Sequence, residues 1–237
     1  MARIALRLLL VVTVLAVSAA CLVLVLEIRG HSQSRRLLSD AQSLRVGEST
    51  ASDIQGFVLR HGGFKADSEF CGTADSCYIV QTGPTVTLNR LFLSSDRFQR
   101  WLGVRPWGVN ATFQITQSRL SGLLVESIAY TAENDEQLDS RLHIETPGGP
   151  GATPYFAHYT VSRGHIHIFE VWITPQANPL ERARGFDFDL SCQIAYSGCG
   201  NVCQLMPSAW VDYQREPFGK DSPIPAEEVN DPRCNKF

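Results

Sequence analysis

LLLVVTVLAVSAACLVLVL, residues 8–26, is the stretch around which the chain is organised; it begins at Leu8 and ends at Leu26. Its 19 residues carry no charge, and Thr13 and Ser18 are its polar interruptions. An apolar helix of about 20 residues crosses the roughly 30 Å hydrocarbon core of a bilayer. The stretch therefore predicts one transmembrane helix within residues 1–28.

Two other interpretations of this segment are open. A cleaved signal peptide would place the small residues Ser18 and Ala20 before the cut, and a lipoprotein signal would use Cys21 as the lipidated residue. The apolar run is longer than the roughly 7–15 residues of a cleaved signal. It also continues past either site to Leu26. We therefore expect a retained signal anchor that contacts the lipid bilayer.

The charges around the span and the cysteines beyond it favour opposite orientations. Arginines precede the span at positions 3 and 7 and follow it at 29, 35 and 36, which slightly favours a cytoplasmic C-terminal side. An even number of cysteines beyond a targeting segment indicates disulfides in an oxidising compartment. The six that follow the span are Cys71, Cys77, Cys192, Cys199, Cys203 and Cys234. We give them more weight and expect a periplasmic or cell-surface domain.

The cysteine spacing favours one pair. CGTADSC, residues 71–77, is a short loop that Cys71 and Cys77 would close, and the other four cysteines allow three pairings. Zinc or free thiols are the alternatives. Structural zinc sites prefer C-x2-C pairs, whereas five, six and three residues intervene here.

Charge and length restrict the class of protein. The part after the span holds all 24 acidic and 19 of the 21 basic residues, a formal charge of −5. Nucleic-acid binding needs a basic footprint, so we expect no nucleic-acid partner. Residues 47–237 suffice for one domain with its own core. We expect residues 29–46 to form a helical juxtamembrane stalk, one face of which carries Leu37, Leu38, Ala41 and Leu44.

LRVGESTASDIQGFVLRHGG, residues 44–63, carries the best local signal after the span. Thr50 is a candidate N-cap with Asp53 three residues later, an apolar stripe follows, and Gly62 supplies a stop. The pattern of a leucine, a glycine, a hydroxyl residue and an acid before an aliphatic resembles the opening helix of small BamE-like envelope domains. That resemblance implies an envelope context and no activity.

Alternating apolar and polar residues predict the strands. One runs over residues 109–116, turns at 120–122 and pairs with 123–131; a second hairpin joins 155–161 to 165–174; a last strand covers 186–194. Hairpin turns dominate and long helical crossovers are missing. We expect an α+β fold, with about seven mostly antiparallel strands and one or two short helices, stapled by disulfides.

GFDFDLSCQIAYSGCGNVCQLMP, residues 185–207, resembles the C-terminal region of uncharacterised, membrane-anchored bacterial envelope proteins. The likeness rests on the phenylalanine alternation, the Ser-Cys step and the following Gly-Cys step. It implies a bacterial envelope context and supplies no mechanism.

The most site-like residues are two histidines. His165 and His167 point to one face of a strand, as metal ligands do, and His143 or His158 could supply a third ligand. Asp187 and Asp189 also share a face, which is the ordinary pattern of a solvated strand.

Catalytic signatures are absent from the sequence. It contains no G-x-S-x-G, H-E-x-x-H, P-loop or dinucleotide fingerprint, and no C-x-x-C redox pair. We therefore expect a non-catalytic envelope protein, without a cofactor, that binds or scaffolds a protein partner. The alternative is a metal-binding protein or enzyme that uses His165 and His167, and a cytosolic domain with reduced cysteines is a third possibility.

Overall fold

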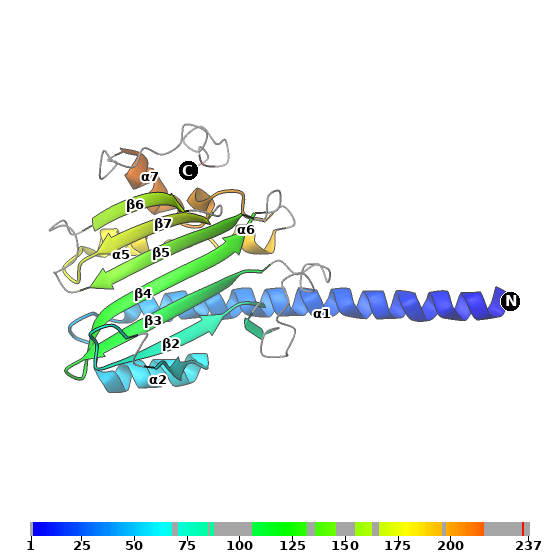
Figure 1. The fold of residues 1–237 in the computed structure, drawn as a ribbon, viewed down its shortest axis with the longest axis horizontal. Coiled ribbons are helices and arrows are strands. Elements are labelled where there is room, and N and C mark those ends of the chain that lie inside the picture. Colours follow the sequence, from blue (N-terminus) through cyan, green and yellow to red (C-terminus); the bar gives the residue numbers. More distant parts are fainter. Residues whose placement is uncertain are drawn as a thin grey trace.

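The structure, a computed structural model, describes residues 2–67, 71–84, 86–87, 106–131, 136–145, 155–162, 166–195, 198–215 and 234. Within these residues a long N-terminal helix leads into a sheet of seven strands with short helices (Figure 1). The strands are β1 (Phe64–Lys65), β2 (Ser76–Thr82), β3 (Gly108–Thr116), β4 (Arg119–Tyr130), β5 (Gln137–Glu145), β6 (Tyr155–Ser162) and β7 (Ile166–Ile173).

The sheet is mixed but mostly antiparallel. Its strand order is β1-β2-β3-β4-β5-β7-β6. β5 and β7 run parallel, and the other neighbouring pairs described are antiparallel. The expected α+β class is confirmed, as is the hairpin of β6 and β7, which places β7 between two neighbours.

The turn between β3 and β4 differs from our expectation. It is formed by Gln117 and Ser118, whose φ angles are 51° and 61°. Two consecutive residues with positive φ make the type I′ turn that matches the twist of a hairpin. The turn expected at residues 120–122 is therefore wrong, and β4 already begins at Arg119.

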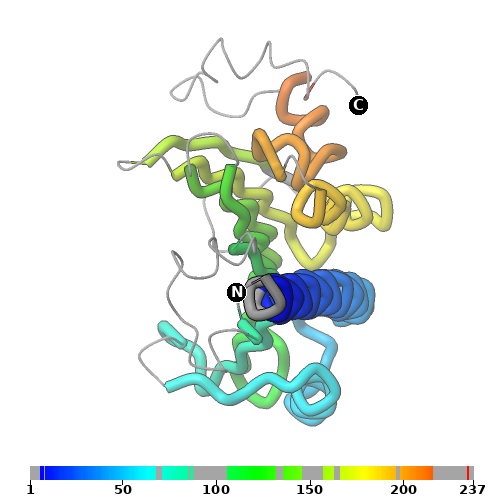
Figure 2. Tube along the Cα trace, turned by 90° about the vertical axis from the view of Figure 1, so that its right-hand side faces the viewer, coloured from blue at the N-terminus to red at the C-terminus, as the bar shows by residue number. Residues whose placement is uncertain are grey.

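The helices lie on one side of the sheet. They are α1 (Ala2–Ser43), α2 (Ala51–His61), α5 (Pro179–Gly185), α6 (Ser191–Ile194), the 3-10 turn η2 (Val202–Gln204) and α7 (Pro207–Arg215). Figure 2 shows the sheet nearly edge-on, with α1, α2 and the C-terminal helices on the same side of it. Side chains from this face of the sheet and from the helices form one core cluster.

α1 is one uninterrupted helix of 42 residues with two different environments. Its first part is exposed and apolar, and of the helices described it is the one long and apolar enough to cross a membrane, a property that it shares with signal sequences. Its last part lies on the sheet, where Leu37 and Ala41 are fully buried. Residues 29–46, for which we expected a juxtamembrane stalk, thus place their apolar face in the domain core.

α2 has the predicted boundaries. Thr50 caps it, accepting a hydrogen bond from the Asp53 amide, while the Asp53 carboxylate accepts one from the Thr50 amide. Gly62 ends the helix in the left-handed conformation with φ of 69°. Both signals are local, so the sequence alone reveals them.

The strand expected over residues 186–194 is wrong. Phe186 caps the C-terminal end of α5, no regular structure covers residues 187–190, and α6 follows. Of the apolar residues in this segment, Phe186, Leu190 and Cys192 are buried, so the sequence pattern partly follows burial. The pattern fails at Ile194, which is 45 % exposed. A chain that passes over a core in an irregular path can show the same alternation as a strand.

Three disulfides join the six cysteines that follow α1. They pair Cys71 with Cys77, Cys192 with Cys199 and Cys203 with Cys234. The predicted Cys71–Cys77 loop is confirmed. Cys21, in the exposed part of α1, is a free thiol.

Candidate functional site

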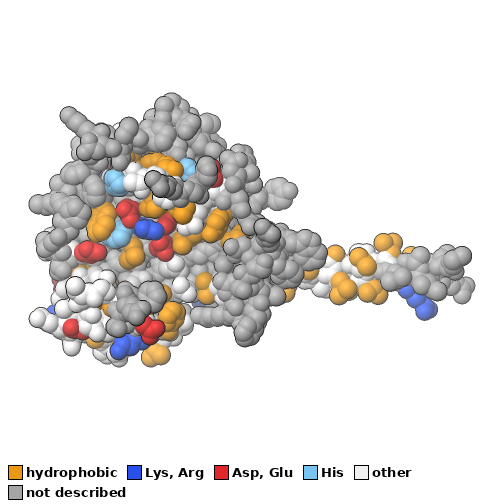
Figure 3. Space-filling model, in the orientation of Figure 1, with side chains coloured by type: hydrophobic (Ala, Val, Ile, Leu, Met, Phe, Trp, Pro, Cys, Tyr) orange, Lys and Arg blue, Asp and Glu red, His pale blue; other side chains and the backbone are white. Residues whose placement is uncertain are grey.

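The face of the sheet opposite the helices carries a row of polar residues that crosses its strands. Each member is the direct cross-strand partner of the next, so the row runs at right angles to the strands. The row consists of Gln81, Asn110, Glu126, Arg141, Glu170 and His158, from β2 to β6. Figure 3 shows acidic and basic side chains gathered on this face, with histidine and hydrophobic side chains around them. We call this surface the open face and this set the polar row.

Arg141 lies at the centre of the polar row and contacts three carboxylates. Its Nε donates to Glu126 Oε1 at 3.1 Å, its Nη2 to Asp139 Oδ2 at 2.5 Å and its Nη1 to Glu170 Oε1 at 3.3 Å. The cross-strand register places Glu126 and Glu170 on either side of Arg141, and Asp139 precedes it by two residues on the same strand face. The group thus holds more carboxylates than cations.

Two further side chains extend this group. Asn110 Nδ2 donates to Glu126 Oε2 at 3.0 Å, and His143 Nε2 lies 3.5 Å from Glu170 Oε1. The pKa of Glu170 lies below its ordinary value, because His143 first and Arg141 next favour its ionised form. The His143 ring stacks on Trp172 with 3.9 Å between centroids and 4° between planes.

Asp139 is the buried member of the group. Its side chain is 2 % exposed, against 29 % for Arg141. Burial first, and the charge of Glu126 next, raise the pKa of Asp139 to about 7, although Arg141 acts in the opposite direction. Asp139 Oδ1 accepts no hydrogen bond in the described part of the chain.

Largely apolar rows lie on both sides of the polar row. One contains Leu124, His143 and Trp172, and the other contains Ile128, Asp139 and Ile168. Leu124, Ile128, Ile168 and Trp172 are all half-buried. The open face therefore has a charged centre between rows that contain half-buried apolar side chains.

Sequence reasoning did not identify this group. Each member is an isolated polar residue on its own strand, and only the register aligns them. One signal was present: Glu170 is the acid inside an otherwise apolar central strand, HIHIFEVWIT.

The predicted histidine pair has a different environment. His165 lies outside the described residues. His167 faces the helix side of the sheet, where its Nδ1 is 2.8 Å from Tyr159 Oη and its Nε2 is 3.3 Å from Glu136 Oε2. Tyr159 is 2 % exposed, so its hydroxyl is inside the core and cannot reach a substrate.

The two histidines proposed as a third metal ligand lie on the other side of the sheet. His143 and His158 belong to the open face, as their pairing with Trp172 and Glu170 shows. The sheet therefore separates both of them from His167. Among the residues described, no group of three or more histidine, cysteine, aspartate or glutamate side chains could hold a metal ion.

Asp187 and Asp189 serve local structure. Asp187 Oδ2 accepts from Ser208 Oγ at 2.5 Å, and Asp189 Oδ1 accepts from the amide of Ser191, the first residue of α6, at 2.8 Å. The two carboxylates thus have separate structural partners, and these contacts do not direct them to one substrate site.

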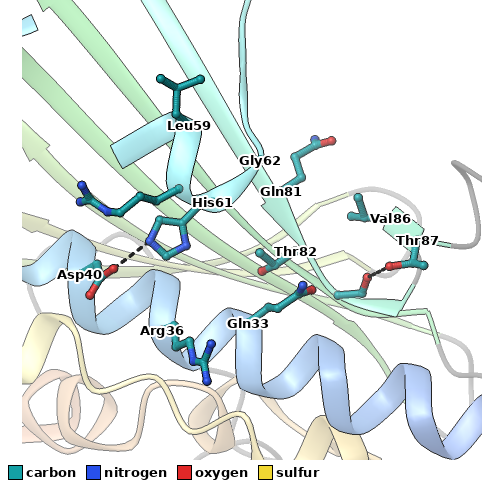
Figure 4. A pocket seen from close by; sticks show the side chains of 12 residues that line it. Gln33, Arg36, Asp40, Leu59, His61, Gly62, Gln81, Thr82, Val86 and Thr87 are labelled. Atoms are coloured by element: carbon teal, nitrogen blue, oxygen red, sulfur yellow. Dashed lines mark hydrogen bonds and ion pairs between the residues drawn. The ribbon is translucent and has the colours of Figure 1, made fainter. Parts of the chain in front are cut away.

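A pocket with a volume of about 570 Å³ lies between α1, α2 and the end of β2 (Figure 4). His61 Nε2 and Asp40 Oδ2 are 2.9 Å apart on its wall, and the dashed line in Figure 4 marks this contact. Ser34 and Thr82, 2.8 Å apart, form a buried pair that joins α1 to β2. His61 has no hydroxyl or thiol partner among the described contacts, so the pair lacks the nucleophile of a catalytic triad.

Comparisons with known proteins give no match for this chain, whether with protein-family models, with curated proteins or with solved structures.

Proposed function

We propose that the protein is a single-pass bacterial envelope protein whose extracytoplasmic domain binds a partner protein through the open face. The observation that carries this proposal is the continuity of α1, which runs without interruption from the exposed apolar segment into the core of the domain. A helix without a hinge holds the domain in a fixed orientation to the bilayer.

In that orientation the open face stands roughly perpendicular to the bilayer surface. α1 lies along the covered face of the sheet, and its axis is roughly parallel to the plane of the sheet (Figures 1 and 2). Membrane-spanning helices cross the bilayer with an average tilt of about 20°. The sheet would therefore stand upright on the membrane, with the open face accessible to a neighbouring envelope protein.

The disulfides support the extracytoplasmic location. Three cystines in the soluble part are expected in an oxidising compartment and are rare in the cytosol. The apolar segment near the N-terminal end of α1 supplies the anchor.

The contacts favour binding over catalysis. The acid–base pairs described above either engage each other, as Arg141 and its carboxylates do on the open face, or lack a nucleophile, as His61 and Asp40 do. The open face also has half-buried apolar side chains and unused hydrogen-bonding capacity, which a protein interface needs.

Photocrosslinking in the native membrane tests the proposal. A photoreactive phenylalanine analogue at Leu124 or Ile168 probes the open face, while the same analogue at Leu59 or Leu180, 81 % and 60 % exposed on the helix side, serves as the matched control. We expect a discrete protein adduct from the open-face positions and none from the controls. Adducts from all four positions alike, or from none, would contradict the proposal.

A further inference from the structure

We infer that the open face receives an amphipathic helix of the partner, laid across the strands with a basic, an acidic and a basic side chain on successive turns. These would face Glu126, Arg141 and Glu170. The inference rests on the proposed docking function and names the chemistry of its partner.

The spacing of the polar row supports a helix. Glu126, Arg141 and Glu170 lie on the adjacent strands β4, β5 and β7 and pair directly across them. Neighbouring strands are about 4.8 Å apart, and one helical turn rises about 5.4 Å. Over two intervals the mismatch is only about 1 Å, which long lysine or arginine side chains absorb. In an extended segment the side chains on one face repeat about every 6.7 Å, so over two intervals the mismatch with the strand spacing would be about 4 Å.

The charged residues of the polar row retain capacity to bind charged side chains of a partner protein. Three carboxyl groups surround the single guanidinium of Arg141; because the pKa of Asp139 is raised to about 7, Glu126 and Glu170 carry most of the negative charge of the group at neutral pH. Glu170 Oε1 contacts both Arg141 and His143, and Glu170 Oε2 has no partner among the described residues. Arg141 uses three N–H groups, whereas a guanidinium has five. A guest cation would thus bind at Glu126 or Glu170, and a guest carboxylate at Arg141.

The flanking rows accommodate the rest of such a helix. Leu124 and Trp172 lie on one side of the polar row, and Ile128 and Ile168 lie on the other. All four are half-buried, so a helix could remove the remainder of their surface from water. Apolar residues adjacent to the three charges complete the recognition pattern.

Three helical peptides test this inference on the full-length protein in lipid nanodiscs. The first carries Lys, Glu and Lys at positions i, i+4 and i+7 of a leucine-rich face; the second carries Glu, Lys and Glu there; the third has the charges of the first on its opposite face. By fluorescence anisotropy we expect the first to bind at least about ten-fold more tightly than the others, because like charges oppose each other in the second.

Matched protein variants locate the contact. Glu170→Gln should reduce the advantage of the first peptide, whereas Glu145→Gln should not, although Glu145 lies on the same face at the end of β5. Equal binding of the first two peptides, or no binding of the first, would overturn the inference. If photocrosslinking at Leu124 still gave a partner adduct, the docking function would stand and only the helix pattern would be wrong.

Discussion

Trp107 Nε1 donates a hydrogen bond of 2.6 Å to Glu27 Oε2, which ties the start of β3 to the residue directly after the apolar stretch of α1. Trp107 is 2 % exposed and Glu27 is half-buried, so this contact is partly shielded from water. The sheet is therefore attached to α1 at the point where the expected membrane span ends, and further contacts follow along the helix.

The first prediction concerns Gly30, where α1 lies against the chain that follows β2. A Cβ at this position would lie 3.0 Å from Pro84 Cδ and 3.2 Å from the Gly83 carbonyl carbon. Gly30→Ala should therefore lower the free energy of unfolding by about 1–3 kcal/mol, the range typical of overpacking. Gly56→Ala is the matched control, because its Cβ meets only Arg60 Nη1 at 3.8 Å. It should stabilise α2 by about 0.5–1 kcal/mol. Denaturant unfolding of both variants measures the difference, and equal effects would contradict it.

Arg182 leads to the second prediction. From α5 it donates to the Gln42 carbonyl at 3.1 and 3.2 Å and to the Leu44 carbonyl at 2.5 Å, and so satisfies the end of α1. Burial first, and the charge of Arg45 next, lower the pKa of Arg182 to about 10, so it stays charged at neutral pH. Arg182→Met should cost about 2–4 kcal/mol, because charged hydrogen bonds are lost and carbonyls are left unpaired.

Arg184 provides the control for this substitution on the same helix. Its side chain is 41 % exposed and pairs with Asp212, whose side chain is 19 % exposed, at 3.0 Å. Because an ion pair with a partly solvated cation contributes little, Arg184→Met should cost less than about 1 kcal/mol. Thermal unfolding of both variants in detergent tests the contrast, which would fail if the two losses were alike.

The third prediction is a pH dependence that Asp139 causes. Its pKa is raised from 3.8 to about 7 in the folded protein. Between these values the native state holds a proton that the unfolded state has released, so the free energy of unfolding falls as pH rises through this window and levels off above it. The total effect is on the order of a few kcal/mol. Asp139→Asn removes this titration, and urea unfolding should show a flatter profile from pH 4 to 7. An unchanged slope in the variant would contradict the prediction.

The fourth prediction concerns the disulfides. Alkylation without reduction, followed by mass measurement of protein from its native membrane, should modify Cys21 alone. Six further modified thiols would place the domain in the cytoplasm and overturn the proposed location.

The disulfides should also differ in their contribution to stability. Cys203 and Cys234 are 31 residues apart, and Cys71 and Cys77 are six apart. Loop-closure entropy then gives about 4 kcal/mol for the longer loop and about 2 kcal/mol for the shorter. Replacing each pair by serine and comparing denaturant midpoints checks the order, and a larger loss for the shorter loop would contradict it.

The sequence predicted the elements whose signals are local. The capping box of Thr50 and Asp53, the alternation over residues 109–116 and the Cys71–Cys77 loop are each encoded within a few neighbouring residues, and all three are confirmed. The alternation over residues 186–194 was misleading, because burial of every second residue also occurs where an irregular segment crosses a core.

The candidate site could not be predicted in this way. Glu126, Arg141 and Glu170 come from three strands, and the parallel pairing of β5 with β7 brings the last two together. Arg182 likewise lies 138 residues from Leu44, whose carbonyl it binds. Contacts of this kind depend on register and packing, which no short stretch of the chain specifies.

The sequence by itself determined the long apolar helix, the even set of cysteines, the α+β class and the capped second helix, because composition, periodicity and caps act over a few residues. Only the tertiary structure decided that the supposed stalk belongs to the core and that the polar row lies on the open face. The physical reason is that a helix face or a strand face acquires a role only from the surface that packs against it, and distant residues supply that surface.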